Sequence, residues 1–187
     1  MARGRPSKKA QIVQAACELF IKQGYQGTSI DQVVAAAAVS KPTVYSNFTT
    51  KLVLWESVLV EIIQRAEQDL AAEIMKLTHA NNQDALSGWL SLWHTWCAQP
   101  ERLATYRILL GEQYKMNSST LSLFAQFEEV LLSQLKAWLK MAYGPENAFF
   151  SLTAISKEAL LTPALLQKEV LDNTLLQNSL KVFFNQK

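Results

Sequence analysis

Residues 24–51 hold the feature that most constrains this chain, which is a pair of short helical segments with a tight turn between them. Ser29 is followed three residues later by Gln32, the spacing of a capping box that begins a helix. Ser40 is a good N-cap for the next segment, and Pro42 is tolerated in a first helical turn. The pattern predicts two short helices joined by a turn.

The rest of the chain also has helical periodicity. Apolar residues recur every three or four positions in each segment, and Gly and Pro number only 6 and 5 in 187 residues. We therefore expect an all-α protein of about nine helices without strands. They are predicted near residues 8–24, 29–37, 40–48, 51–77, 83–98, 100–116, 118–144, 145–161 and, starting at Pro163 or Gln167, up to 184.

Charge is distributed unevenly along the sequence. Residues 1–51 carry seven basic and two acidic side chains, a net charge of +5, whereas residues 52–187 carry a net charge of −3. A basic N-terminal segment on an acidic remainder favours contact with a polyanion. Charge alone leaves an ordinary solvated tail equally open, because four of the basic residues lie within the first nine.

Composition excludes several classes of protein. Apolar residues make up 49 % of the chain, enough for a core, and charged residues 18 %, too few for a disordered protein. No apolar stretch follows the basic N-terminus, and no run of about 18 uncharged apolar residues occurs, so we expect no signal peptide, no membrane contact and a cytoplasmic location. Cys17 and Cys97 are predicted to be buried thiols, with a redox role left open.

The third helix is predicted to face outward with short polar side chains. Such a helix suits the DNA major groove, where Thr43 and Ser46 allow close approach and Asn47 can read an adenine edge. Lys41 and Lys51 are candidate phosphate contacts. The other candidates are Tyr45 and Ser40 on the same helix, Thr28 and Ser29 at the start of the second helix, and Arg3 and Arg5 in an arm that could enter the minor groove. Each of these residues also has a simpler alternative role. Ser40 could only cap the helix, Tyr45 could only pack on the first helix, and Lys51 could only lie in solvent.

Residues 12–59 closely resemble the DNA-binding domain of the TetR family of bacterial regulators. The matching elements are Ala15-Ala16-x-x-Leu19-Phe20, Gly24-Tyr25-x-x-Thr28-Ser29-Ile30 and the run from Val33 to Lys51 that includes Val39-Ser40-Lys41-x-Thr43-Val44-Tyr45-x-x-Phe48. The resemblance implies a homodimeric repressor, less often an activator, whose third helix reads a palindromic duplex operator. It also implies that the C-terminal part binds a small molecule. Family positions that contact DNA fall on Thr28, Ser40, Lys41, Thr43, Tyr45, Ser46, Asn47 and Lys51.

The chain departs from the family pattern at Ala38, at Asn47 and at Thr49-Thr50, which replaces a usual proline- or serine-containing bend. Ala38 stands in the turn where the family usually has Gly, and a left-handed alanine costs about 1 kcal/mol. We therefore expect a slightly rearranged turn. Asn47 stands where an aromatic residue or histidine is common, which alters the expected base preference.

Aromatic residues cluster in the predicted fifth to seventh helices. Clustered Trp side chains can line an apolar ligand cavity, although a Trp stripe at helical spacing also serves as ordinary core. We expect a small apolar or aromatic effector there, with no cofactor and no metal, because the histidines and cysteines lack ligand spacing. The candidate lining residues are Trp89, Trp93, His94, Trp96, Tyr106, Arg107, Tyr114 and Trp138.

The last two helices have apolar residues around most of their circumference. A helix that covers only its own core needs a narrower stripe, so this pattern favours a two-fold dimer built from four helices. A fully buried pair of core helices is the alternative. The candidate interface residues are Phe149, Leu152, Ile155, Leu171, Leu175, Leu176 and Phe183.

These predictions give a domain division and one functional hypothesis with rivals. Residues 1–50 are expected to form the helix-turn-helix domain and residues 51–187 the effector and dimerisation domain, connected by the helix at 51–77. No nucleophilic constellation, phosphate loop or paired carboxylates point to an enzyme. A helical protein-interaction module whose helix-turn-helix no longer binds DNA remains as the alternative to a ligand-released repressor.

Overall fold

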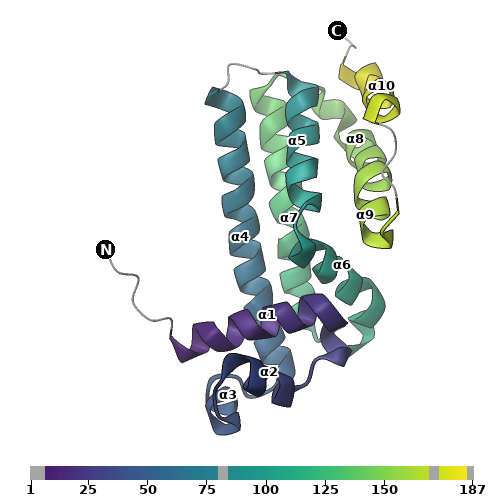
Figure 1. Cartoon of the computed structure of the whole chain (residues 1–187). Helices are drawn as coiled ribbons and strands as arrows, with labels where there is room; N and C mark the ends of the chain where they lie inside the picture. Colours follow the sequence, from purple (N-terminus) through teal and green to yellow (C-terminus); the bar gives the residue numbers. More distant parts are fainter. Residues whose placement is uncertain (1–6, 80–83, 169–172, 185–187) are drawn as a thin grey trace. The chain divides into compact units, whose positions relative to one another are not determined.

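We describe a computed structural model of the chain, which covers residues 7–79, 84–168 and 173–184. Its helices are labelled in Figure 1, and the first seven along the chain are α1 to α7. Their bounds are α1 (Lys8–Gly27), α2 (Ile30–Ala37), α3 (Lys41–Asn47), α4 (Lys51–His79), α5 (Ala85–Cys97), α6 (Pro100–Glu112) and α7 (Ser118–Met141). A short 3₁₀ turn, η1 (Gln113–Lys115), follows α6. The all-helical prediction is confirmed for the part of the chain described.

The C-terminal helices differ in one respect from the prediction. After the 3₁₀ turn η2 (Glu146–Ala148), α8 (Phe149–Ser156), the π-helical turn η3 (Lys157–Leu161) and α9 (Thr162–Leu166) follow without interruption, and α10 (Asn173–Phe184) comes last. The predicted break at Leu161 is therefore wrong. Pro163 lies in the first turn of α9, directly after the wider π turn, where its missing N–H is tolerated. The stretch ends instead at Gln167, which has a left-handed backbone with φ 54°.

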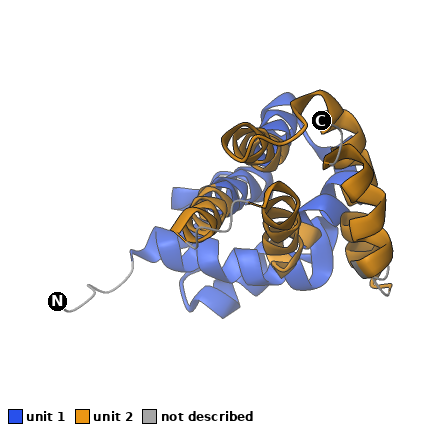
Figure 2. Ribbon diagram, turned by 90° about the horizontal axis from the view of Figure 1, so that it is seen from above, with its two compact units in different colours: residues 1–63, 104–127 blue, residues 64–103, 128–187 orange. Residues whose placement is uncertain are grey.

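The chain forms two compact units, coloured separately in Figure 2. Unit 1 comprises residues 1–63 and 104–127, and unit 2 comprises residues 64–103 and 128–187. The helices α4, α6 and α7 each contribute residues to both units. The division at residue 50, into a helix-turn-helix domain and an effector and dimerisation domain, stays a prediction.

The core of unit 1 joins α1 to the short helices. Phe20 of α1 packs edge-on against Trp55 of α4, with ring centroids 4.9 Å apart. Val33 of α2 and Val44 of α3 are fully buried, and so is Phe48 directly after α3. The inward orientation of Val44 and Phe48 leaves the opposite face of α3 in solvent.

The core of unit 2 is built on tryptophan. Trp89, Trp93, Trp96 and Trp138 are fully buried. Gly88 makes room for Trp138, because a Cβ atom at position 88 would lie 2.0 Å from the Cζ2 atom of that indole. This contact explains why α5 carries a glycine in the middle of a helix, where glycine is otherwise unfavourable.

Both cysteines are free in the structure. Cys17 is buried, and burial raises the pKa of Cys97 to about 12. A thiol with such a pKa carries almost no thiolate near neutral pH, and thiolate is the reactive form. The structure therefore favours the structural role of Cys97 over a redox role.

Candidate nucleic-acid interface

The helix α2 begins at a complete capping box. The Ser29 hydroxyl oxygen accepts a hydrogen bond from the backbone N–H of Gln32 at 3.2 Å, and the Gln32 side chain accepts one from the Ser29 N–H at 2.7 Å. The predicted cap is confirmed. Two of the N–H groups that a helix start leaves free are thereby satisfied, which fixes where α2 begins.

The turn between α2 and α3 depends on Ala38. This residue has φ 51° and ψ 45°, the left-handed conformation, and its N–H donates to the carbonyl of Ala35. The Val39 N–H donates to the carbonyl of Val34 at 3.3 Å. The turn thus keeps the left-handed geometry that suits glycine, and Ala38 adopts it at a steric cost. The expected rearrangement of the turn does not occur.

The helix α3 presents a polar face to solvent. Ser40 caps it by accepting from the Thr43 N–H at 3.3 Å, and the two hydroxyl groups are 2.7 Å apart. Ser46 and Asn47 are exposed, and both donate to the carbonyl of Thr43. Tyr45 is 45 % exposed. The predicted reading residues Lys41, Tyr45, Ser46 and Asn47 are therefore all exposed on this short helix.

Lys41 is paired across the turn. Its ammonium lies 2.8 Å from a carboxylate oxygen of Asp31 at the start of α2, and this hydrogen bond raises the pKa of Lys41. Both side chains are exposed, so the pair adds little to stability and is screened by salt. A phosphate can replace Asp31 as the partner at little cost.

The side chains of two other candidate phosphate contacts, Thr28 and Lys51, make hydrogen bonds within the chain. Thr28 is buried and its hydroxyl donates to the carbonyl of Gly24 at 2.8 Å, so this side chain does not face solvent. The Lys51 ammonium donates to the carbonyls of Tyr25 and Thr28 at 2.8 and 2.9 Å, and partial burial lowers its pKa. Lys51 is thus held against the turn before α2, while Ser29 stays exposed. Arg3 and Arg5 lie outside the described residues.

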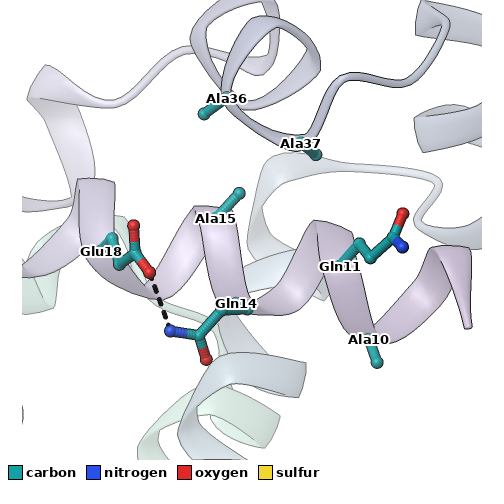
Figure 3. Close-up of a pocket in the computed structure, with 7 residues that line it drawn as sticks. All are labelled: Ala10, Gln11, Gln14, Ala15, Glu18, Ala36 and Ala37. Atoms are coloured by element: carbon teal, nitrogen blue, oxygen red, sulfur yellow. Dashed lines mark hydrogen bonds between the residues drawn. The ribbon is translucent and has the colours of Figure 1, made fainter. Parts of the chain in front are cut away.

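An open groove of about 310 Å³ lies between α1 and α2 (Figure 3). Alanine side chains of both helices line it, together with Gln11 and a hydrogen-bonded pair, Gln14 and Glu18. A carboxylate in this position disfavours a phosphate. The groove shares no residue with the predicted DNA contacts, and we assign it no binding role.

The comparisons with known proteins agree with this geometry. The family model described as "Bacterial regulatory proteins, tetR family" matches residues 12–58, the segment that contains α1 to α3 and the start of α4. Residues 12–58 of the chain are therefore similar to the N-terminal segment of TetR-family regulators. The resemblance noted in the sequence is thereby confirmed.

Two curated relatives and one solved structure define the likeness further. The chain is 38 % identical over 55 residues to the HTH-type transcriptional activator FasR of Mycolicibacterium smegmatis, covering 29 % of this chain and 25 % of FasR. It is 27 % identical over 171 residues to an HTH-type transcriptional repressor of Streptomyces coelicolor, covering 87 % and 83 % of the two chains. The multidrug binding protein EbrR, solved with malachite green, shares the fold at a TM-score of 0.69, 18 % identity and coverage of 97 % and 100 %.

The chain covers 25 %, 42 % and 31 % of the length of three curated relatives that it matches.

The residues predicted to line an effector cavity fall in both units. The four tryptophans are buried in unit 2, where Trp89 donates to the Ser156 hydroxyl at 2.9 Å and Trp138 to the Ala85 carbonyl at 2.8 Å. His94 is exposed on α5 and borders a shallow surface pocket. Tyr106 is buried in unit 1, whereas Arg107 and Tyr114 of that unit are exposed. The predicted set is thus divided between the two units.

The predicted dimer residues are also divided. Leu152 and Leu176 are buried within this chain, so they belong to its own core and differ from the expectation. Phe149, Ile155 and Phe183 are half-buried, and Leu175 is 57 % exposed. Leu171 lies outside the described residues. The accessible apolar surface of the C-terminal helices also includes Phe150, Leu166 and Val182, which belong to the apolar pattern but not to the list of candidate interface residues.

Proposed function

We propose that this chain is a dimeric, DNA-binding transcriptional regulator of the bacterial cytoplasm, a repressor that a small molecule releases from its operator. The observation that carries the proposal is the Ser40-capped helix α3, whose outer face offers Lys41, Tyr45, Ser46 and Asn47 to solvent. A helix of this kind fits the major groove, with its N-terminal residues near the base edges. The repressor of Streptomyces coelicolor, which is similar over 87 % of this chain, supports repression as the direction of regulation.

Direct contacts are assigned to the residues that the fold leaves accessible. Asn47 must give up its bond to the Thr43 carbonyl to read a base, and Lys41 must exchange Asp31 for a phosphate. Both exchanges occur at the surface, where one hydrogen bond replaces another at little net cost. Ser29 and the N-terminus of α2 can hold a further phosphate.

The exposed apolar residues of the C-terminal helices support dimerisation. Phe150 of α8 is 84 % exposed, and Leu175 and Val182 of α10 are seven residues apart and therefore lie on one face. Among the described residues, Glu146–Leu166 is long and apolar enough to cross a membrane, and only 28 % of its most apolar window is buried. Lys157 and Glu158 interrupt it, and each charge costs about 3 kcal/mol at a membrane centre. A second copy of the chain is the partner that suits such a surface.

Effector binding is assigned to unit 2. Within the described residues, the indole N–H of Trp93 and the hydroxyl of Thr153 are buried without a hydrogen-bond partner. Unsatisfied buried polar groups cost free energy and need an explanation, and a polar atom of a bound ligand supplies one. The malachite green complex of EbrR supports an aromatic effector.

The first experiment identifies the duplex and tests DNA binding. The purified chain selects its site from a library of random 40-base-pair duplexes, and fluorescence anisotropy then measures affinity for the recovered duplex at several salt concentrations. We expect a palindromic site with steeply salt-dependent binding. Lys41→Ala should lower the slope of log K against log salt by about one unit per subunit, as expected for a lost phosphate contact. Lys140→Ala, at an exposed lysine of α7 in unit 2, is the matched control.

A second pair of variants tests the reading face. Tyr45→Ala should weaken binding of the selected duplex about tenfold, equal to 1.4 kcal/mol. Tyr143→Ala should leave it unchanged, because Tyr143 is 94 % exposed in the other unit. A folded wild-type chain that enriches no duplex at low salt would favour the protein-interaction module instead.

The effector hypothesis is tested with malachite green as the first probe. Titration should quench tryptophan fluorescence and weaken binding of the selected duplex over the same concentration range. Trp93→Phe should reduce the affinity for the dye. Quenching that leaves duplex affinity constant contradicts release by a ligand.

A further inference from the structure

The helix α1 is interrupted near its end, just before α2. Gly24 has φ 76° and ψ 177°, a conformation outside the helical region, so α1 is broken there and resumes for one turn, residues 25–27. The first N–H groups after such a break have no partner within the turn that follows. The N–H groups of Tyr25 and Gln26 therefore need an acceptor from another part of the chain.

Glu112 supplies that acceptor. One carboxylate oxygen accepts from the Tyr25 N–H at 3.1 Å and the other from the Gln26 N–H at 2.9 Å. Glu112 is the last residue of α6, and these bonds join residues 86 and 87 positions apart within unit 1. The Tyr114 hydroxyl, two residues later, accepts from the Gln26 side chain at 3.0 Å. Three hydrogen bonds thus connect the end of α6 to this turn.

The carbonyl groups of the same turn are satisfied from the other direction. Lys51 donates to the carbonyls of Tyr25 and Thr28, and the Thr28 hydroxyl donates to that of Gly24. The Lys51 ammonium also lies 4.4 Å from the centre of the Tyr25 ring. The turn is therefore held by a carboxylate on its N–H side and by an ammonium on its carbonyl side. A single change at either group leaves buried or half-buried backbone atoms without partners.

The held turn leads directly into the reading helices. Ser29, the N-cap of α2, comes three residues after Gln26 and one after Thr28. The position of α2 determines that of α3, because only residues 38–40 separate them. A shift of residues 25–28 therefore moves the start of the whole helix-turn-helix.

We propose that Glu112 is a positioning residue for DNA binding, which fixes the direction in which the chain enters α2 by holding the N–H groups of Tyr25 and Gln26. This inference rests on the proposed function, since it concerns the reading of DNA by α3. The link carries any displacement of the end of α6 into the turn. Loss of the hydrogen bonds from Tyr25 and Gln26 to Glu112 leaves the DNA-contacting residues of α3 unchanged, but the position of α3 is no longer fixed.

Amide hydrogen exchange measures the link without reference to DNA. In Glu112→Ala, the amides of Tyr25 and Gln26 should exchange at least about tenfold faster than in the wild-type chain, while amides in the middle of α7 keep their rates. Glu112→Gln retains one acceptor oxygen and should give a smaller increase. Unchanged exchange at both amides in Glu112→Ala overturns the proposal.

The matched control is Glu56→Gln. Glu56 also accepts a long-range hydrogen bond within unit 1, but from the Thr120 hydroxyl at 2.8 Å and not from the backbone of the turn. Glu56→Gln reproduces the loss of one carboxylate charge. Circular dichroism confirms that each variant is folded at the temperature of the measurements.

Anisotropy with the duplex recovered by selection gives the functional readout. Glu112→Ala should bind it about tenfold more weakly, Glu112→Gln less than tenfold, and Glu56→Gln as tightly as the wild-type chain. Glu112→Ala binding as tightly as Glu56→Gln overturns the role of Glu112 and leaves the proposed function standing. A wild-type chain that binds no duplex overturns the proposed function, and this inference with it, even where amide exchange responds.

Discussion

The reading segment and the tryptophan helix are stabilised in different ways. The helices α2 and α3 have eight and seven residues, and each buries one valine. Their ends are set by side-chain caps and by the left-handed Ala38. The helix α5 has thirteen residues, of which seven are buried, and three of these are tryptophans. Local hydrogen bonds thus define the first region, and tight packing of large side chains defines the second.

This difference predicts unequal sensitivity to substitution. A packed interior has no room for added atoms, whereas a capped helix at the surface loses only the bond that is removed. Polar changes in the reading segment should therefore alter DNA binding more than folding. Small changes of volume in the interior of unit 2 should do the opposite.

The largest effect is expected for Gly88→Ala. The new Cβ atom would lie about 2 Å from two atoms of the Trp138 indole, whose N–H is fixed by the Ala85 carbonyl. Because the indole cannot retreat without losing that bond, we expect a destabilisation of about 3 kcal/mol. Urea denaturation followed by circular dichroism measures it.

Gly111→Ala is the control for that substitution. Gly111 lies in α6, and a Cβ atom there would meet nothing within 4 Å. Alanine is the better helix former, so this variant should gain about 0.5–1 kcal/mol. A similar change in stability in the two variants would show that contact with Trp138 does not govern position 88.

An intermediate effect is expected for Asp69→Asn. Asp69 pairs with Arg102, whose side chain is fully buried, contacts the Trp96 ring and donates to the Thr95 carbonyl at 2.8 Å. Burial lowers the pKa of Arg102, and Asp69 opposes that effect. Removing the carboxylate leaves a buried charge less compensated. Asp69 is 43 % exposed, so the loss of stability should be about 1–3 kcal/mol, below that of a fully buried pair.

Lys76→Ala provides the comparison for the ion pair. Lys76 pairs with Glu73 at 3.3 Å, and its side chain is 75 % exposed. The change in the free energy of unfolding should stay within about 0.5 kcal/mol. A loss as large as that of Asp69→Asn would contradict the role assigned to burial.

The two regions also differed in what their sequence could predict. The caps at Ser29 and Ser40 and the start of α4 at Lys51 were readable, because each depends on residues three or four positions apart. The outward face of α3 followed from the same periodicity. The placement of Lys51 against two carbonyls was not readable, since a lysine in solvent and a lysine on a turn look alike in sequence.

Contacts distant in sequence were missed altogether. Nothing near Glu112 indicates that it accepts from Tyr25 and Gln26, because a single glutamate at the end of a helix is ordinary. Buried Leu152 and Leu176 could not be told from exposed Leu175, because the whole C-terminal pattern is apolar and position on a helix does not specify which face finds a neighbour. Gly88 gave no signal before Trp138 was placed beside it.

A small gain in stability is expected for Ala38→Gly. Ala38 is exposed, and its left-handed backbone is costly for alanine and free of strain for glycine. Glycine also increases the entropy of the unfolded chain, which offsets part of the gain. We expect a net increase of about 0.5–1 kcal/mol in the free energy of unfolding. The affinity for the selected duplex should stay the same, because the turn already has the geometry that glycine prefers.

Ala35→Gly separates this explanation from a general effect of glycine. Ala35 is exposed on α2, three residues earlier and inside the helix, so glycine there should lower stability by about 0.5–1 kcal/mol. The two substitutions have the same chemistry on the same surface and differ in backbone conformation alone. Opposite signs would locate the strain at residue 38. A loss of stability in both variants would mean that Ala38 is not strained in solution, and that the reading segment depends less on its turn than the comparison with α5 implies.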